Sequence, residues 1–270
     1  MKKIFWTSIL VLTIISSVSV TVSNLAPVKA DNKLQHNTQL NQVINFEDPA
    51  IKQGTILSLS AILGRIATDS DLTQENLNKI TDLSTYGNAK LSSLSDLKNL
   101  PNLKYVGLQS INASKIIDSN PLESLKNLKE FTFLQLDSQL TSLSPLKDKS
   151  LSKLVIHSLP VLDDSEKSLN EISSLTSLDI SYMENSKKVN VGTLDSISNL
   201  KEITLYGLNL SVAPTLKNSK NLEYVNFSSN DLTSVPDLPH SKNLWYIALD
   251  RNKVDNYTNI EEILQLPNPP

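Results

Sequence analysis

Apolar positions along this chain follow one phrase: a leucine, two variable residues, an apolar residue, one variable residue and a second apolar residue. The phrase occurs seven times, and its copies begin at Leu103, Leu128, Leu151, Leu175, Leu200, Leu222 and Leu244. Successive copies are 25, 23, 24, 25, 22 and 22 residues apart. A fixed period in this range with this phrase is typical of leucine-rich repeats. The pattern therefore predicts an α/β repeat fold: a leucine-rich-repeat solenoid with a parallel concave sheet.

Each copy has its own local structure. The apolar-x-apolar step has a period of two, so both apolar side chains point to one face of a short strand. Upstream leucines at three-residue spacing, such as Leu94, Leu97 and Leu100, predict a 3₁₀-like return leg that closes over the strand. Stacked copies bury these faces against each other. An amphipathic helix in an ordinary domain is the alternative for one triplet, but registration over seven copies disfavours it.

A helical cap is expected before the repeats, because the open end of a solenoid would expose its leucines. Asp48 followed by Pro49 predicts a helix start. The apolar residues expected on its buried face are Ile56, Leu59, Leu63 and Ile66. A second short helix is expected near residues 70–77, and residues 80–83 resemble a degenerate first strand.

The turns after the strands differ along the array. Asn230 and Asn252 follow the last complete strands, where an asparagine ladder would bond the loop backbone. Earlier copies carry apolar residues at the equivalent point: Ile111, Leu136, Leu159, Met183 and Leu208. We therefore expect local irregularity between about residues 111 and 191.

The first 30 residues read as a signal peptide. Lys2 and Lys3 precede an apolar run, and the segment closes on Val28-Lys29-Ala30, which predicts cleavage after Ala30. An uncleaved membrane anchor is the alternative, and the serines in the second half of the run disfavour it. The expected organisation is a signal peptide (1–30), a flexible segment (31–42), a helical N-cap (43–78), leucine-rich repeats (79–254) and a C-terminal tail or truncated cap (255–270). The mature protein is expected to be secreted, with no visible anchor and no stable membrane insertion.

Composition excludes several classes of protein. The 270 residues hold no cysteine, so disulfide frameworks, thiol nucleophiles and thiolate zinc sites are excluded. Lys and Arg number 25 against 28 Asp and Glu, for a formal net charge of −3. A mildly acidic chain with two arginines is a poor nucleic-acid binder. The mean hydropathy of −0.16 argues against a polytopic membrane protein.

Candidate chemistry is sparse, and the chain is not expected to be an enzyme. His157 could act as a base with Asp179 of the next copy, but a solvent-facing strand histidine is the favoured interpretation. The acidic run at residues 163–166 lacks the alternating ligand spacing of a calcium loop. No glycine-rich phosphate loop and no glycine-flanked serine elbow occur. No metal and no cofactor are expected.

Residues 43–50, Val-Ile-Asn-Phe-Glu-Asp-Pro-Ala, resemble the helical N-cap motif of the internalin family of Gram-positive bacteria. Residues 71–73 and 80–83 resemble the segment that joins that cap to its repeats, and Val235-Pro236 resembles a degenerate inter-repeat turn. The resemblance implies a secreted or surface protein that binds a partner protein through its concave sheet, with a host receptor among the candidates. Family repeats are usually 22 residues long, and an immunoglobulin-like domain often follows them. Either a small secreted member or a truncated chain fits these differences.

Strand residues that alternate with the core positions should face the concave side in three columns. Tyrosines concentrate at the C-terminal end of these columns, where Tyr206, Tyr224 and Tyr246, with Trp245 beside them, are expected to form one aromatic binding patch. The candidate partner-binding residues are Tyr105, Asp179, Tyr206, Tyr224, Trp245, Tyr246 and Asp250. Tyrosines that merely suit β-strands are the alternative interpretation. The alternative function is that of a cell-envelope structural or glycan-binding protein, which could be a fragment of a larger adhesin.

Overall fold

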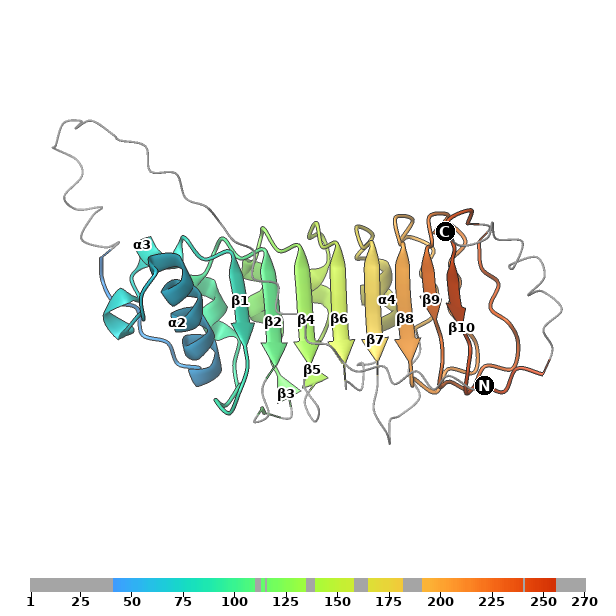
Figure 1. The fold of residues 1–270 in the computed structure, drawn as a ribbon, viewed down its shortest axis with the longest axis horizontal. Helices are drawn as coiled ribbons and strands as arrows, with labels where there is room; N and C mark the ends of the chain where they lie inside the picture. Colours follow the sequence, from blue (N-terminus) through green and yellow to red (C-terminus); the bar gives the residue numbers. More distant parts are fainter. Residues whose placement is uncertain are drawn as a thin grey trace, which may run out of the picture.

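The structure is a computed structural model that describes residues 41–109, 113–114, 116–134, 139–157, 165–181, 191–239 and 241–255. Parallel strands stand side by side in one row, with a helix covering one end of the row (Figure 1). The sheet has eight strands in the order β1-β2-β4-β6-β7-β8-β9-β10. Their bounds are β1 Asp82–Thr85, β2 Tyr105–Gln109, β4 Glu130–Leu134, β6 Lys153–His157, β7 Ser177–Ser181, β8 Glu202–Tyr206, β9 Tyr224–Asn226 and β10 Tyr246–Ala248. The predicted solenoid with a parallel sheet is confirmed.

The strand register follows the leucine phrase. Val106 pairs with Phe131, Phe131 with Leu154, and the equivalent positions stay paired through β10. Leu83 of β1 pairs with Val106, which confirms that residues 80–83 begin a degenerate first copy. Each strand thus contacts the next copy of the same sequence pattern, and no strand crosses over another.

The return legs contain the predicted 3₁₀ turns. These are η2 Ser95–Asn99, η3 Asn120–Ser124 and η4 Ser144–Leu146, and a short helix, α4 Ser165–Asn170, takes this place in a later repeat. The short strands β3 Ile116–Ile117 and β5 Gln139–Leu140 pair in a second, two-stranded parallel sheet. Leucines of legs and strands, among them Leu94, Leu97 and Leu103, are fully buried in one continuous core. Burial of this stack supplies the main stabilisation that a single repeat lacks.

The cap helix α2 Pro49–Leu63 begins where the sequence predicts and ends earlier than its apolar spacing suggests. Asp48 is the N-cap, and its side chain accepts hydrogen bonds from the backbone N–H groups of Ala50 and Ile51. Gly64 ends the helix with φ of 66°, a left-handed conformation that favours glycine. The prediction for Ile66 is therefore wrong: it lies beyond the helix and is 84% exposed. The other three predicted residues, Ile56, Leu59 and Leu63, pack on the core as expected.

The helix approaches the sheet closely because Gly54 faces β1. A Cβ added at Gly54 would lie 2.6 Å from the carbonyl oxygen of Ser84. The second predicted helix is split, because Leu72 and Thr73 interrupt it. Its parts are η1 Asp69–Asp71 and α3 Gln74–Leu77, and Thr73 caps the second part through Asn76 N–H.

Two buried carboxylates join the cap to the first repeat. The Asp48 Oδ2 atom accepts hydrogen bonds from the N–H groups of Ser92 and Ser93, at 2.7 and 2.9 Å. The Asp96 Oδ2 atom in turn accepts from the N–H groups of Glu47 and Asp48, at 2.9 and 2.7 Å. Burial raises the pKa of Asp96, and these hydrogen bonds partly oppose that rise. The reciprocal pair fixes how the cap sits on the array.

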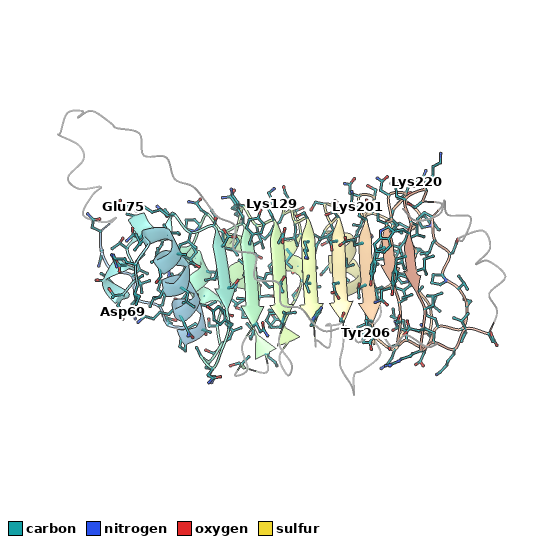
Figure 2. All side chains as sticks on the ribbon, in the orientation of Figure 1. Asp69, Glu75, Lys129, Lys201, Tyr206 and Lys220 are labelled. Atoms are coloured by element: carbon teal, nitrogen blue, oxygen red, sulfur yellow. The ribbon has the colours of Figure 1, made fainter. Side chains whose placement is uncertain are left out.

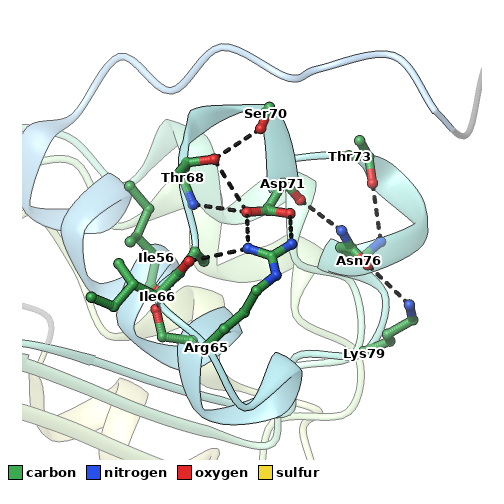
Figure 3. A network of polar contacts seen from close by, with 11 residues as sticks. Ile56, Arg65, Ile66, Thr68, Ser70, Asp71, Thr73, Asn76 and Lys79 are labelled. Atoms are coloured by element: carbon green, nitrogen blue, oxygen red, sulfur yellow. Dashed lines mark hydrogen bonds and ion pairs between the residues drawn. The ribbon is translucent and has the colours of Figure 1, made fainter.

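A second polar network holds the segment after α2 (Figure 3). Arg65 donates to both carboxylate oxygens of Asp71, at 2.8 Å from Nη1 and 2.5 Å from Nη2. Thr68 N–H adds a third hydrogen bond to the same carboxylate. The Arg65 guanidinium therefore holds the pKa of Asp71 well below its usual range. This network orients the link between the helices even though Arg65 itself is exposed.

The predicted asparagine ladder is present at its two positions. The Asn230 Oδ1 atom accepts from Leu208 N–H and Leu210 N–H, while its Nδ2 atom donates to three carbonyl oxygens, those of Leu205, Phe227 and Ser228. Asn252 repeats the arrangement one turn later, with its Oδ1 atom accepting from Leu232 N–H. At the preceding turn, Leu208 is buried instead.

Several predictions fall outside the described residues. These concern the signal peptide and flexible segment before residue 41, the acidic residues Asp163 and Asp164, and the tail after residue 255. The apolar turn residues Ile111, Leu136, Leu159 and Met183 also lie outside them. Within the described part of the chain, no helix is long and apolar enough to cross a membrane.

Candidate partner-binding face

The strand register places the alternating residues in three columns on the concave face, as predicted. The first column reads Tyr105, Glu130, Lys153, Ser177, Glu202, Tyr224 and Tyr246. The second reads Gly107, Thr132, Val155, Asp179, Thr204, Asn226 and Ala248. The third is in register from β2 to β8 and reads Gln109, Leu134, His157, Ser181 and Tyr206. Core positions alternate with these columns and are buried. Most column residues are polar or aromatic, and Val155 and Ala248 of the second column are buried.

Three aromatic rings meet at the C-terminal end of this face. Tyr224 and Tyr246 are register partners on β9 and β10, and their rings stack with centroids 4.5 Å apart and planes 3° apart. Trp245 precedes β10, and its ring tilts against both tyrosines, with centroids 5.9 Å from Tyr224 and 5.7 Å from Tyr246. We call Tyr224, Trp245 and Tyr246 the aromatic cluster.

The aromatic cluster is a solvent-facing surface. Trp245 is 58% exposed and Tyr246 is 39% exposed, while Tyr224 is half-buried between its neighbours. Burial raises the pKa of Tyr224, and the negative charge of Asp179 adds to the rise. The Tyr224 phenol is protonated at neutral pH, as an ordinary tyrosine is, and its O–H group can donate a hydrogen bond. The cluster offers apolar ring faces together with polar edges.

Tyr206 does not belong to the aromatic cluster, so the prediction of one patch with Tyr206, Tyr224 and Tyr246 is wrong. It lies at the C-terminal end of β8, two residues after Thr204, whereas Tyr224 pairs with Glu202 at the other end of that strand. Figure 2 shows Tyr206 at the lower edge of the sheet, opposite Lys201. Adjacent strands bring two residues together only when their register positions also match. Tyr105, on β2, stands near the opposite end of the array and is exposed.

His157, Asp179 and Ser181 form a polar group at the centre of the face. The His157 Nε2 atom lies 3.1 Å from Asp179 Oδ2, and the Ser181 hydroxyl donates to Asp179 Oδ1 at 2.6 Å. A nucleophilic serine would instead donate to the histidine that deprotonates it. Both side chains here bind the carboxylate, so the group orders Asp179 and has no nucleophile–base pair.

Asp250 is held in a similar way after β10, where the Ser228 hydroxyl donates to its Oδ1 atom at 2.5 Å. Among the described residues, no group of three His, Cys, Asp or Glu side chains is arranged to hold a metal ion. The face thus combines fixed carboxylates with an aromatic cluster and suits recognition more than bond-making chemistry.

One feature was missed from sequence: lysines gather on the turns that lead into the strands. Figure 2 shows Lys129, Lys201 and Lys220 along that edge of the sheet. Their recurrence two residues before, or one residue after, the first leucine of a copy is visible in the sequence. The predicted binding face was built from strand positions, and these lysines lie on the turns.

Three of the solved structures that are similar to this chain come from bacteria. InlP of Listeria monocytogenes superposes with a TM-score of 0.57 at 18% sequence identity, covering 78% of this chain and 62% of that protein. A leucine-rich-repeat protein of Leptospira interrogans aligns over 72% of this chain and 55% of its own length, at 20% identity and a TM-score of 0.46. Internalin C2 of L. monocytogenes aligns over 78% of this chain and 96% of its own, at 21% identity and a TM-score of 0.37.

The likeness to InlP confirms the internalin-like leucine-rich-repeat fold with its helical cap. The chain spans less than two thirds of the length of InlP. No protein-family profile matches the sequence, and no curated protein is similar to it. Solenoids of this kind present an extended concave surface that typically binds other proteins.

Proposed function

We propose that this chain is an exported binding protein that docks a partner protein on its concave face, with the aromatic cluster as the anchor. The observation that supports this most is the exposure of three mutually packed rings on a rigid sheet. Tyrosine and tryptophan are enriched in binding hot spots, because they bury a large area with few torsions to order. Packing against each other pre-orders the rings before a partner arrives.

The rest of the face supplies the rim of the proposed interface. Asp179 and Asp250 are held by serine hydroxyls, so each carboxylate is already oriented toward solvent contacts. Tyr206 and Tyr105 add exposed or half-buried rings farther from the anchor. Fixed polar groups around an aromatic centre match the anatomy of specific protein interfaces. A host receptor is one class of partner that this surface would suit.

Tyr224→Ala and Tyr246→Ala are each expected to weaken partner binding by about 1–3 kcal/mol, because each removes one ring of the stack. The combined loss should differ from the sum of the single losses, since each ring supports the other. Isothermal titration against the protein captured from host-cell extract measures both effects. Tyr86→Ala is the matched control, because Tyr86 is exposed and follows β1, at the opposite end of the array from the aromatic cluster.

A normal circular dichroism spectrum together with unchanged binding by the double variant would move the anchor elsewhere. Parallel capture with purified bacterial cell wall separates this proposal from the envelope alternative. Retention on cell wall that survives loss of both tyrosines, without retention of a host protein, would favour a structural or glycan-binding role.

Export is the second part of the proposal. The charged start, apolar run and Val28-Lys29-Ala30 are expected to direct cleavage, so the mature chain should begin at Asp31. N-terminal sequencing of protein from the culture medium checks this. Recovery in membranes alone, with Met1 still present, would contradict it.

A further inference from the structure

Lysines are dense around the turns that enter strands β2, β4 and β6, with Lys98 in η2 and Lys153 at the start of β6 included. These turns connect the 3₁₀ legs η2, η3 and η4 to the sheet. We call the group the lysine edge, and its members are Lys98, Lys104, Lys126, Lys129, Lys147, Lys149 and Lys153. Six of them are exposed, and only Lys149 is half-buried. Figure 2 shows Lys129 projecting from this edge of the sheet.

The lysine edge has little compensating charge. Among the residues that the structure describes, none of its seven ammonium groups lies in an ion pair, whereas Lys52, Lys201 and Lys253 do. Glu130 pairs in register with Lys153 across β4 and β6, yet the two side chains form no ion pair. Glu123 and Asp148 are the acids on the same turns. Seven lysines therefore lie near four acids, since the buried Asp96 of η2 adds to Glu123, Glu130 and Asp148, and none of these carboxylates forms an ion pair with them.

Crowding of like charge is visible at Lys149. Its Nζ atom donates to the backbone carbonyl oxygens of Leu125 and Glu123, at 3.0 and 3.4 Å. Burial lowers the pKa of Lys149, the positive charge of Lys126 lowers it further, and the Glu123 carboxylate raises it. An anionic ligand would be attracted to the like charges gathered along this edge.

Neighbouring parallel strands lie ~4.8 Å apart, so equivalent residues of successive repeats form ranks with that spacing. Lys104 and Lys129 form one such rank, and Lys126 and Lys149 form another, because each pair holds equivalent positions. A linear polymer that carries an anionic group on each successive unit can follow these ranks along the solenoid. Globular anions would reach only one or two of the lysines.

We propose that the lysine edge binds a linear sulfated polysaccharide, independently of the aromatic cluster. A lysine ammonium binds an anionic group as a point charge, without the bidentate geometry that arginine offers, so this edge suits a polymer recognised by its high charge density, as a sulfated polysaccharide is. Neither of the two arginines, Arg65 and Arg251, lies on this edge. Single-stranded nucleic acids also need aromatic rings for stacking, and Tyr105 is the one ring beside these lysines. The chain is acidic as a whole, so only a local cluster could hold a polyanion.

The test compares two triple variants of the full chain with equal changes in net charge. One is Lys126→Gln, Lys129→Gln and Lys153→Gln, which removes exposed members of the lysine edge and leaves Lys149 bonded. The control is Lys217→Gln, Lys220→Gln and Lys242→Gln, which removes exposed lysines from the corresponding turns of the last repeats. Probes are a size-defined heparin fragment, its desulfated form, neutral dextran and single-stranded DNA. Binding is titrated over a series of salt concentrations, and circular dichroism checks the fold of each variant.

The expected result is salt-dependent binding of the heparin fragment, weakened at least about tenfold in the edge variant and less than about twofold in the control. The slope of affinity against salt should fall in the edge variant alone, because fewer counterions are released. Equal losses in both triple variants, undiminished binding of desulfated heparin, or tighter binding of DNA would each overturn the proposal. Absence of heparin binding by the wild-type chain at physiological salt would also overturn it.

Discussion

Asp48→Ala is expected to lower the free energy of unfolding by about 3–5 kcal/mol, because buried N–H donors on both sides of the cap interface lose their acceptor. Asp48 is 1% exposed, so water does not reach it in the folded chain. One carboxylate oxygen caps α2 through Ala50 and Ile51, and the other bonds the backbone of Ser92 and Ser93. The substitution therefore removes a helix cap and the link to the first repeat together.

Urea unfolding followed by circular dichroism measures this loss. Asp69→Ala is the matched control in the same cap, since Asp69 lies in an exposed ion pair with Lys52 and should cost less than about 1 kcal/mol. Similar losses for the two variants would show that the buried carboxylate does not anchor the cap.

Asn230→Ala is expected to destabilise the chain by about 3 kcal/mol, because two buried N–H groups and the carbonyl oxygens on the other side of the turn lose their amide partner. Asn230 is 6% exposed and forms five hydrogen bonds with the backbone. Alanine cannot replace these bonds, since both a donor and an acceptor are needed within one planar group.

The two asparagines of the ladder allow their contributions to stability to be compared within one protein. Asn252→Ala should cost less than Asn230→Ala, because Asn252 is partly exposed and water can replace some of its hydrogen bonds. Asn243→Ala, on an exposed turn, should change the thermal midpoint very little. Thermal unfolding of the three variants gives the order. An equal effect at all three positions would contradict a specific role for the ladder.

Much of the architecture was predictable because each repeat carries the same pattern of apolar positions. The apolar-x-apolar step placed the strands, and equal spacing of the leucines placed Val106, Phe131 and Leu154 in register. The stacking of Tyr224 on Tyr246 follows from that register. Sequence spacing also predicted the helix start at Asp48, where an acid precedes proline.

Other features depended on contacts that sequence spacing does not encode. Ile66 keeps helical spacing, yet Gly64 takes a left-handed conformation and ends α2 before it. Tyr206 lies on the strand next to Tyr224 but at the opposite end, so adjacency in the array did not bring them together. The bond between Asp48 and Ser92 joins residues 44 positions apart, with no local signal at Ser92.

Unequal strand pairing along the described array gives its unfolding a direction. At the N-terminal end, α2 covers β1, and hydrogen bonds of the buried Asp48 and Asp96 carboxylates join the cap to the first repeat. At the other end, β9 and β10 pair over three residues, whereas the central strands pair over five. In a chain whose repeats contact only their neighbours, local opening starts where the interface is smallest and spreads inward. A partner bound to the aromatic cluster would therefore hold β9 and β10 together and make unfolding more cooperative.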